Sequence, residues 1–524
     1  MAQWPSGVEW HNRYLSTDIP QICVRDAESP IASHPMTCFV GVDVGTTNVK
    51  ALALTPNDLS QIIAHASAPV TTLNPEPGYA EQDPAEIWSA FVQVMAEVTR
   101  EVTEAGHTIT HVAFSTAMHS LLAMDATGNP LGNVILWSDN RAEAQATALR
   151  SEQADLGNAI HEETGTPIHP MIPLCKLAWL REHDPRLLRR TAHFGSVKEF
   201  LWQKLTGSFE IDYSIASATG LFDARKKQWS KRAMDYAGVR PEQLALPVPT
   251  TYQRPLQPSL DTAGTGLTAA VSLLIGASDG CLANLGAGAI KPGTATLTIG
   301  TSGAIRQTVR EPFRDSQGRL FCYILDDDHY VVGGPTNNGG NVLEWVSENL
   351  TRLDTKDLLT EAETVPAGCD GLLFMPYLQG ERAPIWNAAV RGAYLHVDWL
   401  HTQAHFARAA LEGVLLNLLS INGLLVEYTG PARVIHANGG FAQSRFWVQM
   451  LADMAGIPVR LNASNESGSM GAILLTMKAV GLVNSLGEAA ERVTFGETFE
   501  PDPPKHRTYI DVFRKWQEGV KTLY

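Results

Sequence analysis

The sequence predicts an α/β protein of two related halves that face each other across a cleft. Three observations lead to this fold class. From Met36 onward, buried-type strands alternate with amphipathic helices. A chain of 524 residues is long enough for two domains that each have a core. A strand–turn–strand motif near the N-terminus also recurs in the second half of the chain, which indicates an internal repeat.

The first copy of the motif is residues 41–54, GVDVGTTNVKALAL, in which apolar strands enter and leave a turn of small hydroxyl residues. A glycine in such a turn lets a phosphate approach the backbone, and threonines offer donors to phosphate oxygens. The nucleotide-binding residues predicted in this segment are Gly45, Thr46, Thr47 and Lys50. Asp43 would stand beside the polyphosphate, where a carboxylate needs a cation, so we interpret it as a Mg²⁺ contact. An ordinary hairpin turn is the alternative.

The second copy is residues 296–305, TLTIGTSGAI. Its predicted phosphate-binding residues are Gly300, Thr301 and Ser302, with Gly300 matching Gly45 and Ser302 matching Thr47. Thr298 stands where the first copy has Asp43. The first turn would therefore hold the metal and the second turn only phosphate, and together they would clamp ATP.

Composition limits the partners of the protein. The formal charge of −15 and the pI near 5.5 argue against nucleic acid or an anionic membrane as a partner. The six cysteines are scattered without a CxxC pair, which is typical of a reduced, cytoplasmic protein without structural zinc. The most apolar run, residues 267–290, is interrupted by polar residues and glycines, so we expect no membrane span.

The chain is expected to divide into three parts. Residues 1–35 contain four prolines and no sustained apolar run, and we expect a loosely ordered extension, with Met36 as an alternative start. Residues 36–271 would form the first domain and residues 272–524 the second. Residues 251–266, rich in proline, glycine and threonine, are predicted to link the halves.

Two strands of the first half are followed by polar clusters. A strand over residues 111–115 leads to Met118 and His119, and a strand over 133–136 leads to Trp137, Asp139 and Arg141. Ligands bind at strand ends in open α/β sheets, so both clusters are predicted to form one polyol-binding pocket. A solvated turn for His119, and a helix start with Asp139 as N-cap and Trp137 in the core, are the alternatives.

The second half contributes a base and a nucleoside site. The strand over residues 273–278 stops at Asp279, just before a small-residue helix, and this carboxylate could accept the proton of a sugar hydroxyl that attacks a phosphate. A helix cap is the alternative. A strand that runs into Gly439 and Gly440 leaves room for a nucleotide against the backbone. Asn465 opens a further stretch of small residues.

These stretches together resemble the FGGY carbohydrate kinases of the actin-like ATPase superfamily. Residues 171–183 are similar to the first signature of the family, and residues 405–412 to the latter part of the second, whereas Gly392 and Ala393 depart from it. The resemblance implies two ribonuclease H-like domains with ATP and substrate in the cleft. It also implies Mg²⁺ at Asp43, a general base at Asp279, and adenosine at Gly439, Gly440 and Asn465. The oligomeric state stays open, with a homodimer as one option.

Within the family, residues 118–121, 137–142 and 380–386 are most similar to gluconate kinases. Glycerol kinases usually carry Arg-Glu in place of Met118-His119, and xylulose kinases tend to follow Met-His with glycine. We therefore expect phosphorylation of D-gluconate to 6-phosphogluconate, with His119, Arg141 and Arg382 as candidates to hold the carboxylate. A xylulose or other pentulose kinase is the alternative, and a non-catalytic ATP-binding sensor a more distant one.

Overall fold

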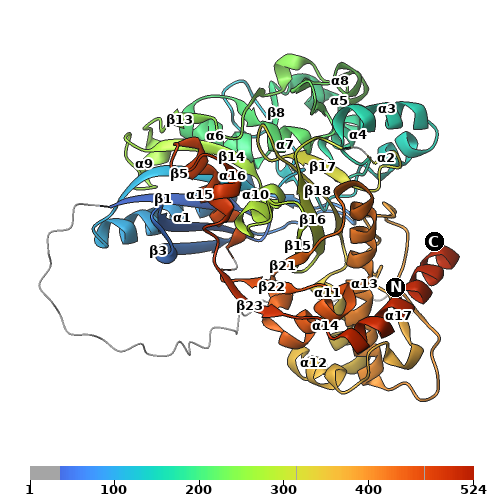
Figure 1. Ribbon diagram of the computed structural model, residues 1–524. Coiled ribbons are helices and arrows are strands. Elements are labelled where there is room, and N and C mark those ends of the chain that lie inside the picture. The colour runs from blue at the N-terminus through green and yellow to red at the C-terminus, as the bar shows by residue number, and fades with distance from the viewer. Residues whose placement is uncertain (1–35, 314, 465) are drawn as a thin grey trace, which may run out of the picture.

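The computed structural model describes residues 36–313, 315–464 and 466–524, so residues 1–35 and Asn465 lie outside the described residues. The chain forms two mixed sheets, one in each half, with helices on both faces (Figure 1). This arrangement confirms the predicted α/β class and the two-domain architecture.

The first sheet has six strands in the order β13-β14-β5-β1-β2-β3. They are β13 (Gln253–Pro255), β14 (Ser272–Ser278), β5 (Thr108–Thr116), β1 (Thr37–Val44), β2 (Asn48–Thr55) and β3 (Asp58–Pro69). β1, β2 and β3 form an antiparallel meander, and β1 pairs in parallel with β5, which pairs in parallel with β14. The carboxyl ends of β1, β5 and β14 therefore meet at one edge of the sheet.

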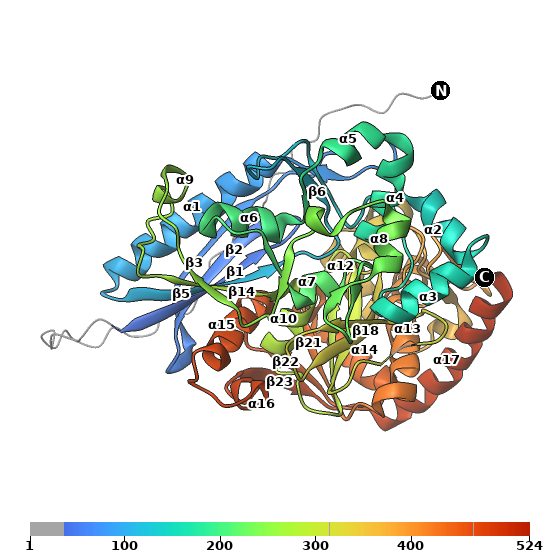
Figure 2. The ribbon, with the colours of Figure 1, turned by 90° about the horizontal axis from the view of Figure 1, so that it is seen from above.

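Helices cover both faces of this sheet (Figure 2). α1 (Pro84–Glu104) lies on one face and begins at Asp83, whose side chain accepts a hydrogen bond from the backbone N–H of Ala85. α10 (Asp279–Gly286) and α15 (Ser467–Ala479) pack on the other face. α15 approaches β1 so closely that a Cβ at Gly41 would lie 2.0 Å from the backbone oxygen of Ser469. A helix from the end of the chain is thus part of the first half.

The second sheet has seven strands in the order β17-β18-β16-β15-β21-β22-β23. They are β17 (Phe321–Ile324), β18 (Tyr330–Thr336), β16 (Gly303–Val309), β15 (Thr294–Ile299), β21 (Val434–Asn438), β22 (Val459–Asn462) and β23 (Phe495–Phe499). β15 pairs with β16 antiparallel and with β21 in parallel, as β1 pairs with β2 and β5. The internal repeat seen in the sequence is therefore a repeat of sheet topology.

The long helix α13 (Gln403–Thr429) is the apolar centre of the second half. It is the one helix in the described part of the chain with the length and hydropathy of a membrane span, but 67% of that apolar window is buried inside the protein. Its neighbours are α11 (Gly340–Val346), α12 (Thr355–Glu363), α14 (Arg445–Ala455) and α17 (Pro503–Leu523). α13 is therefore a core helix.

The remaining α-helices and strands are short. They are β4 (Glu81–Gln82), β6 (Leu122–Met124), β7 (Val134–Ile135), α2 (Glu143–Arg150), α3 (Ala154–Thr164), α4 (Pro173–His183), α5 (Pro185–Arg190), β8 (His193–Gly195), α6 (Val197–Thr206), β9 (Glu210–Asp212), α7 (Tyr213–Ser217), β10 (Phe222–Asp223), β11 (Gln228–Trp229), α8 (Lys231–Ala237), β12 (Leu246–Val248), α9 (Leu260–Ala263), β19 (Leu373–Met375), β20 (Ala393–Leu395) and α16 (Leu486–Ala490). The strand predicted at 133–136 is only the two-residue β7, which pairs with β4 outside the main sheet.

The sheet pairing moves the domain boundary. The predicted division between residues 271 and 272 assigned β14 to the second domain, but β14 pairs with β5 in the first sheet. Part of the predicted linker 251–266 forms the edge strand β13 of that sheet and the helix α9. The first sheet is therefore completed only at Ser278, directly before α10.

Candidate active site

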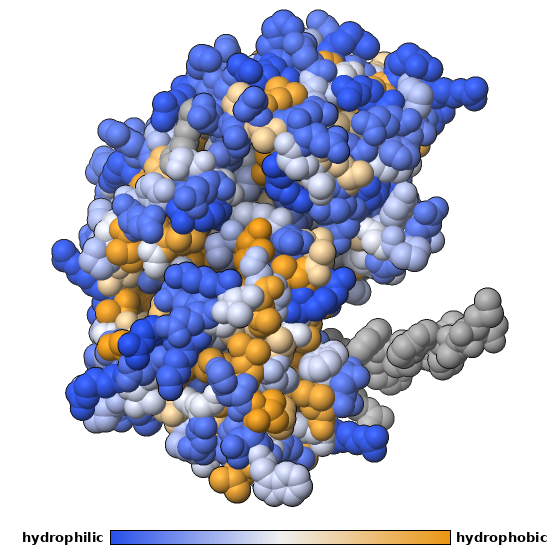
Figure 3. Space-filling view, turned by 90° about the vertical axis from the view of Figure 1, so that its right-hand side faces the viewer, coloured by the Kyte–Doolittle hydropathy of each residue, from blue (hydrophilic) through white to orange (hydrophobic). Residues whose placement is uncertain are grey.

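A cavity of about 910 Å³ separates the two halves, and both halves line it. The first half contributes Thr46 and Thr47 from the β1–β2 turn, and the second contributes Thr301 and Ser302 from the β15–β16 turn. Asp279 also faces this cavity. In the space-filling view the upper half is mainly hydrophilic, and hydrophobic residues gather in the middle and lower part of the molecule (Figure 3).

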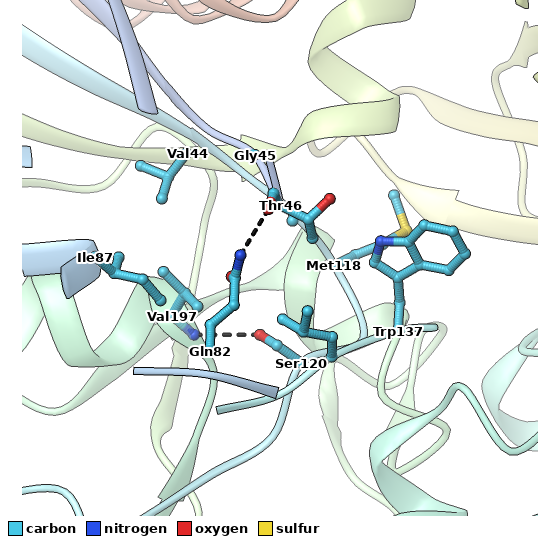
Figure 4. Close-up of a pocket in the computed structure, with 11 residues that line it drawn as sticks. Val44, Gly45, Thr46, Gln82, Ile87, Met118, Ser120, Trp137 and Val197 are labelled. Atoms are coloured by element: carbon cyan, nitrogen blue, oxygen red, sulfur yellow. Dashed lines mark hydrogen bonds between the residues drawn. The ribbon is translucent and has the colours of Figure 1, made fainter. Parts of the chain in front are cut away.

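Each turn is closed by a backbone hydrogen bond from its glycine, but the first turn, residues 45–48, is one residue longer than the second, residues 300–302. The N–H of Gly45 donates to the carbonyl of Asn48 at 3.0 Å, and the N–H of Gly300 donates to the carbonyl of Ser302 at 2.9 Å. The first turn is fixed from below, because Nε2 of Gln82 donates to the carbonyl of Thr46 at 2.6 Å (Figure 4). Both turns thus present small residues to one cavity, as a clamp on a polyphosphate requires.

Asp43 stands at the base of the first turn. Its Oδ1 accepts a hydrogen bond of 2.6 Å from Oγ of Ser115. The pKa of Asp43 is raised from 3.8 to about 6, mainly by burial and in smaller part by the nearby carboxylates of Asp279 and Glu466. A divalent cation would relieve this desolvation and repulsion, so the site fits Mg²⁺. Among the described residues no group of three or more His, Cys, Asp or Glu could hold a metal alone, so phosphate oxygens or water would complete the coordination.

Lys50 lies at the edge of this region, outside the set of residues that line the cavity. Its Nζ pairs with Oε1 of Glu466 at 3.1 Å, and Nε2 of His65 lies 3.7 Å from the same oxygen. This ion pair ties β2 to the start of α15, and the contact of Lys50 with the nucleotide stays a prediction.

Asp279 is placed where strand β14 becomes helix α10. Its Oδ1 accepts a 2.7 Å hydrogen bond from its neighbour Gly280, and Ser278, not Asp279, occupies the N-cap position. Burial raises the pKa of Asp279, while the N–H groups of Gly280 and Met118 and the charge of Arg306 oppose this rise. A half-buried carboxylate in the cavity wall, held by backbone donors, has the position that a general base needs.

His119 and Met118 lie on the same cavity wall. The carbonyl of Ala218 can only accept, so the 2.8 Å contact with Nδ1 of His119 places the proton on Nδ1. Burial lowers the pKa of His119 to about 3, so the ring is neutral and its Nε2 is an acceptor, 3.5 Å from the hydroxyl of Tyr323. His119 is buried, which differs from the solvated turn considered as an alternative. Met118 lies beside Trp137, as Figure 4 shows.

Lys176 holds the polar loops of the pocket together. It is fully buried, and its Nζ donates to the carbonyls of His119, Leu136 and Met171, each at 2.7 Å. These carbonyls belong to the two predicted strand-end clusters and to the start of the first signature. The signature lysine therefore fixes backbone, and the two clusters do form one pocket wall.

Asp139 and Arg141 do not line the cavity, although both were predicted to bind the polyol. The carboxylate of Asp139 is fully buried and accepts from the N–H of Ala80 at 2.7 Å and from the guanidinium of Arg141 at 2.8 Å. Arg141 also pairs with Glu81 at 2.6 Å and lies 3.9 Å above the ring of Tyr79. These groups are engaged in joining two loops, while Trp137, Ser138 and Asn140 face the cavity.

Gly439 shows why glycine stands at the end of β21. Its φ is 95°, and a Cβ there would lie 2.5 Å from the carbonyl oxygen of Ile299. Gly439 and Gly440 are not among the residues that line the cavity, and Asn465 lies outside the described residues, so the adenosine site stays a prediction.

Arg306 was not singled out from the sequence, yet it lines the cavity together with Arg382. Arg306 follows the second turn on β16, with its side chain on the same face as Ala304. A charged residue at an inward position of a strand, directly after the apolar residues Ala304 and Ile305, was the available signal. Arg382 is 8% exposed, and its guanidinium lies 4.8 Å from the ring of Trp137.

Several known proteins are similar to this chain in both sequence and fold. Residues 38–286 match the N-terminal domain, and residues 295–480 the C-terminal domain, of the FGGY family of carbohydrate kinases. The chain is 39% identical to a gluconokinase of Bacillus subtilis over 93% of this chain and 97% of that protein. The crystal structure of a gluconate kinase from Lactobacillus acidophilus has a TM-score of 0.88 at 32% identity, with 93% and 98% of the two chains covered. A xylulose kinase from Lactobacillus acidophilus has the same TM-score at 31% identity, with the same coverage.

Two sheets of repeated topology, with a small-residue turn from each lining the cavity between them, form the two-domain architecture of a kinase of small molecules. The chain belongs to the FGGY family of carbohydrate kinases.

Proposed function

We propose that the protein transfers the γ-phosphate of ATP to D-gluconate and forms 6-phosphogluconate. The observation that carries this proposal is the position of Asp279 in the wall of a cavity that two phosphate-type turns border. The likeness to a gluconokinase over 93% of the chain supports the choice of sugar.

In this proposal, Asp279 accepts the proton of the attacking hydroxyl as the new O–P bond forms, and ADP leaves with the electron pair of the broken bond. Its backbone hydrogen bond to Gly280 fixes the carboxylate in place for that transfer. The N–H and hydroxyl groups of Thr46, Thr47 and the 300–302 turn hold the phosphates. Mg²⁺ bound beside Asp43 would supply positive charge to the phosphate oxygens.

The pocket wall orients the sugar. Nε2 of the neutral His119 accepts a hydrogen bond from a sugar hydroxyl, and Trp137 offers a flat apolar face. Ser138 and Asn140 can exchange hydrogen bonds with further hydroxyls. Closure of the two halves would exclude water and limit ATP hydrolysis.

A pentulose is the second candidate substrate. The structural likeness to a xylulose kinase equals that to a gluconate kinase, both with a TM-score of 0.88, so the fold does not separate the two sugars. A non-catalytic sensor of the same superfamily is a weaker candidate, because a nucleotide-binding module has no use for a carboxylate at Asp279.

The test is ADP release with Mg-ATP and, in turn, D-gluconate, D-xylulose, L-ribulose, glycerol or no sugar. We expect D-gluconate to give the highest kcat/KM. A higher value with D-xylulose or L-ribulose would reject gluconate and keep the kinase. Equal rates with and without every sugar would favour the sensor.

We further propose a cytoplasmic location. Cys38, Cys175, Cys281 and Cys369 are buried free thiols, which suits a reducing compartment. A homodimer is the assembly we would test first, by light scattering of the purified protein.

A further inference from the structure

Two arginines of the second half bring unpaired donors to the sugar side of the cavity. Nε of Arg306 is buried and has no hydrogen-bond partner. A Cβ built on Gly280 would lie 3.4 Å from Nε and 3.6 Å from Nη2 of Arg306, so this guanidinium lies against the first residues of α10. It is therefore close to Asp279, and the opposite charges of the two groups interact.

Arg382 reaches the same region from the loop after β19. Its side chain is 92% buried, since its exposed fraction is 8%. Nη2 donates to the carbonyl of Thr336 at 2.8 Å, whereas Nε is buried without a partner. The guanidinium is held against the ring of Trp137, which also faces the cavity. Arg382 is thus held in place by one hydrogen bond, while its Nε–H group has no partner.

Glu381 and Asp279 offset part of the charge of the two arginines, but the oxygens of Glu381 are engaged with other donors. Glu381 is fully buried, but its oxygens accept from the hydroxyl of Thr336 at 2.6 Å and from the N–H groups of Asn337 and Arg382 at 3.0 and 2.6 Å. The positive charges of Arg306 and Arg382 repel each other. Buried Nε donors without a partner are costly, and an anion between the two guanidiniums would satisfy them and reduce the repulsion between the two charges.

The other cations of the pocket are not available to an anion. His119 is neutral, because its proton is on Nδ1 and faces a carbonyl. Arg141 is held between Asp139 and Glu81, away from the cavity. Lys176 donates to three carbonyls. Of the three candidates that the sequence suggested for the carboxylate, only Arg382 remains.

We propose that Arg306 and Arg382 form an anion subsite that binds the carboxylate of an aldonic acid and so selects sugar acids over neutral sugars. This inference rests on the proposed function, which it deepens by naming the groups that recognise the acid. The γ-phosphate of ATP is the other anion that could occupy the subsite. The two turns already offer donors to phosphate, whereas the arginines lie beside the sugar-facing residues Met118, His119 and Trp137.

The test compares D-gluconate with D-gluconamide, in which a neutral amide of nearly the same shape replaces the carboxylate. The variants are Arg306→Gln and Arg306→Lys. The matched control is Arg310→Gln, because Arg310 follows the same strand but is exposed. Steady-state kcat and KM are measured for both acceptors, and binding of each acceptor without ATP is measured by calorimetry.

We expect the wild type to prefer gluconate, and Arg306→Gln to raise KM for gluconate by about 10- to 100-fold, since a hydrogen bond to a charged group is lost. The values for gluconamide should change less than threefold, so the preference for the acid collapses. Arg306→Lys should keep part of it, and Arg310→Gln all of it. Gluconate binding without ATP should weaken in parallel.

Three results would overturn the assignment. If Arg306→Gln keeps the preference for gluconate, another group holds the acid while the proposed function stands. If kcat falls equally for both acceptors and binding without ATP is unchanged, the arginine acts on the transferred phosphate. If the wild type uses D-xylulose and neither gluconate nor gluconamide, the proposed function fails, and the subsite fails with it.

Thermal unfolding distinguishes a binding role of Arg306 from a structural one. Because Nε of Arg306 is unpaired, Arg306→Gln should unfold at the same or a higher temperature than the wild type without ligand. D-Gluconate should raise the Tm of the wild type much more than that of the variant. A Tm several degrees lower without ligand would mean that Arg306 supports the fold, and would overturn the proposal.

Discussion

The two hairpins of the repeat have the same strand topology but carry a different side chain at one equivalent position of their first strands. In the first half, Asp43 of β1 lies opposite Ser115 of β5, and its carboxylate accepts from that hydroxyl at 2.6 Å. In the second half, Thr298 of β15 lies opposite Asn438 of β21, and its hydroxyl donates to that amide oxygen at 2.6 Å. The same cross-strand contact is charged in one half and neutral in the other. One half can therefore hold a cation, and the other can only offer hydrogen bonds.

The difference extends across the cavity. Two carboxylates belong to the first half: Asp279, directly after β14, lines the cavity, and Asp43, near the end of β1, lies behind the turn that lines it. The guanidiniums of Arg306 and Arg382 belong to the second half. The cavity thus lies between a negative wall, suited to a metal ion and a proton, and a positive wall, suited to anions. Substitutions that remove or exchange the charged side chains of the two walls test whether this separation of charge is needed for the reaction.

The largest effect is expected from the negative wall at Asp279. Asp279→Asn keeps the size of the side chain and its acceptor for Gly280 but cannot take a proton. We expect kcat to fall between about 100- and 10,000-fold, the usual range for a general base. ATP affinity, measured by calorimetry, should stay within threefold of the wild type. A variant with more than a tenth of wild-type kcat would exclude Asp279 as the base.

The next largest effect on the reaction is expected when the residue before one turn is replaced by its equivalent from the other. Asp43→Thr copies the second turn into the first, and we expect about a 100-fold loss of kcat/KM with a higher requirement for Mg²⁺, because the cation loses its protein anchor. The reciprocal change, Thr298→Asp, puts a carboxylate opposite Asn438 and should weaken ATP binding about tenfold by repelling phosphate. Mg²⁺ titrations of ADP release give both numbers. An unchanged Mg²⁺ requirement in Asp43→Thr would refute the metal role.

Local and repeated features of this molecule were predictable from the sequence. The helix α1 can be recognised from its own sequence, because Ile87, Phe91, Val94 and Val98 recur at helical spacing after Asp83. The repeated turn predicted both hairpins, and the end of the strand at Ser278 was predicted as well. In each case the signal lies within about 20 residues, in an apolar period or a turn composition.

What could not be predicted depends on contacts between distant segments. Asp139 was assigned to the sugar because its partner Ala80, 59 residues earlier, cannot be read from a motif. β14 was assigned to the wrong half because its pairing with β5 is non-local. Arg306 was missed because only the assembled cleft shows that its Nε has no partner. The burial of a polar side chain and its hydrogen-bond partners decide whether it supports the fold or can bind a ligand. Both depend on the tertiary structure.

A substitution of Asp139 tests whether this buried carboxylate supports the fold or binds the sugar, and we expect only a small effect on the reaction. Asp139→Asn leaves Arg141 buried with half of its negative partners, so we expect a loss of about 3 kcal/mol in the free energy of unfolding. Urea unfolding measures this loss. KM for gluconate should change less than threefold at a temperature where the variant is folded, since the carboxylate does not face the cavity. A large rise in KM with unchanged stability would restore the direct contact with sugar.

The smallest effect is expected in the pH dependence of kcat/KM, which tests the protonation of Asp43. Burial raises the pKa of Asp43 to about 6, so the carboxylate becomes protonated and neutral as the pH falls through 6. kcat/KM at low Mg²⁺ should therefore fall on the acid side of pH 6. A tenfold rise in Mg²⁺ competes with the proton and should move this limb to lower pH. In Asp43→Thr the limb should no longer depend on Mg²⁺, and the titration of Asp279, whose pKa is also raised, should set it. A limb that ignores Mg²⁺ in the wild type would mean that the proton and the metal do not share Asp43, and that the charge difference between the turns has another purpose.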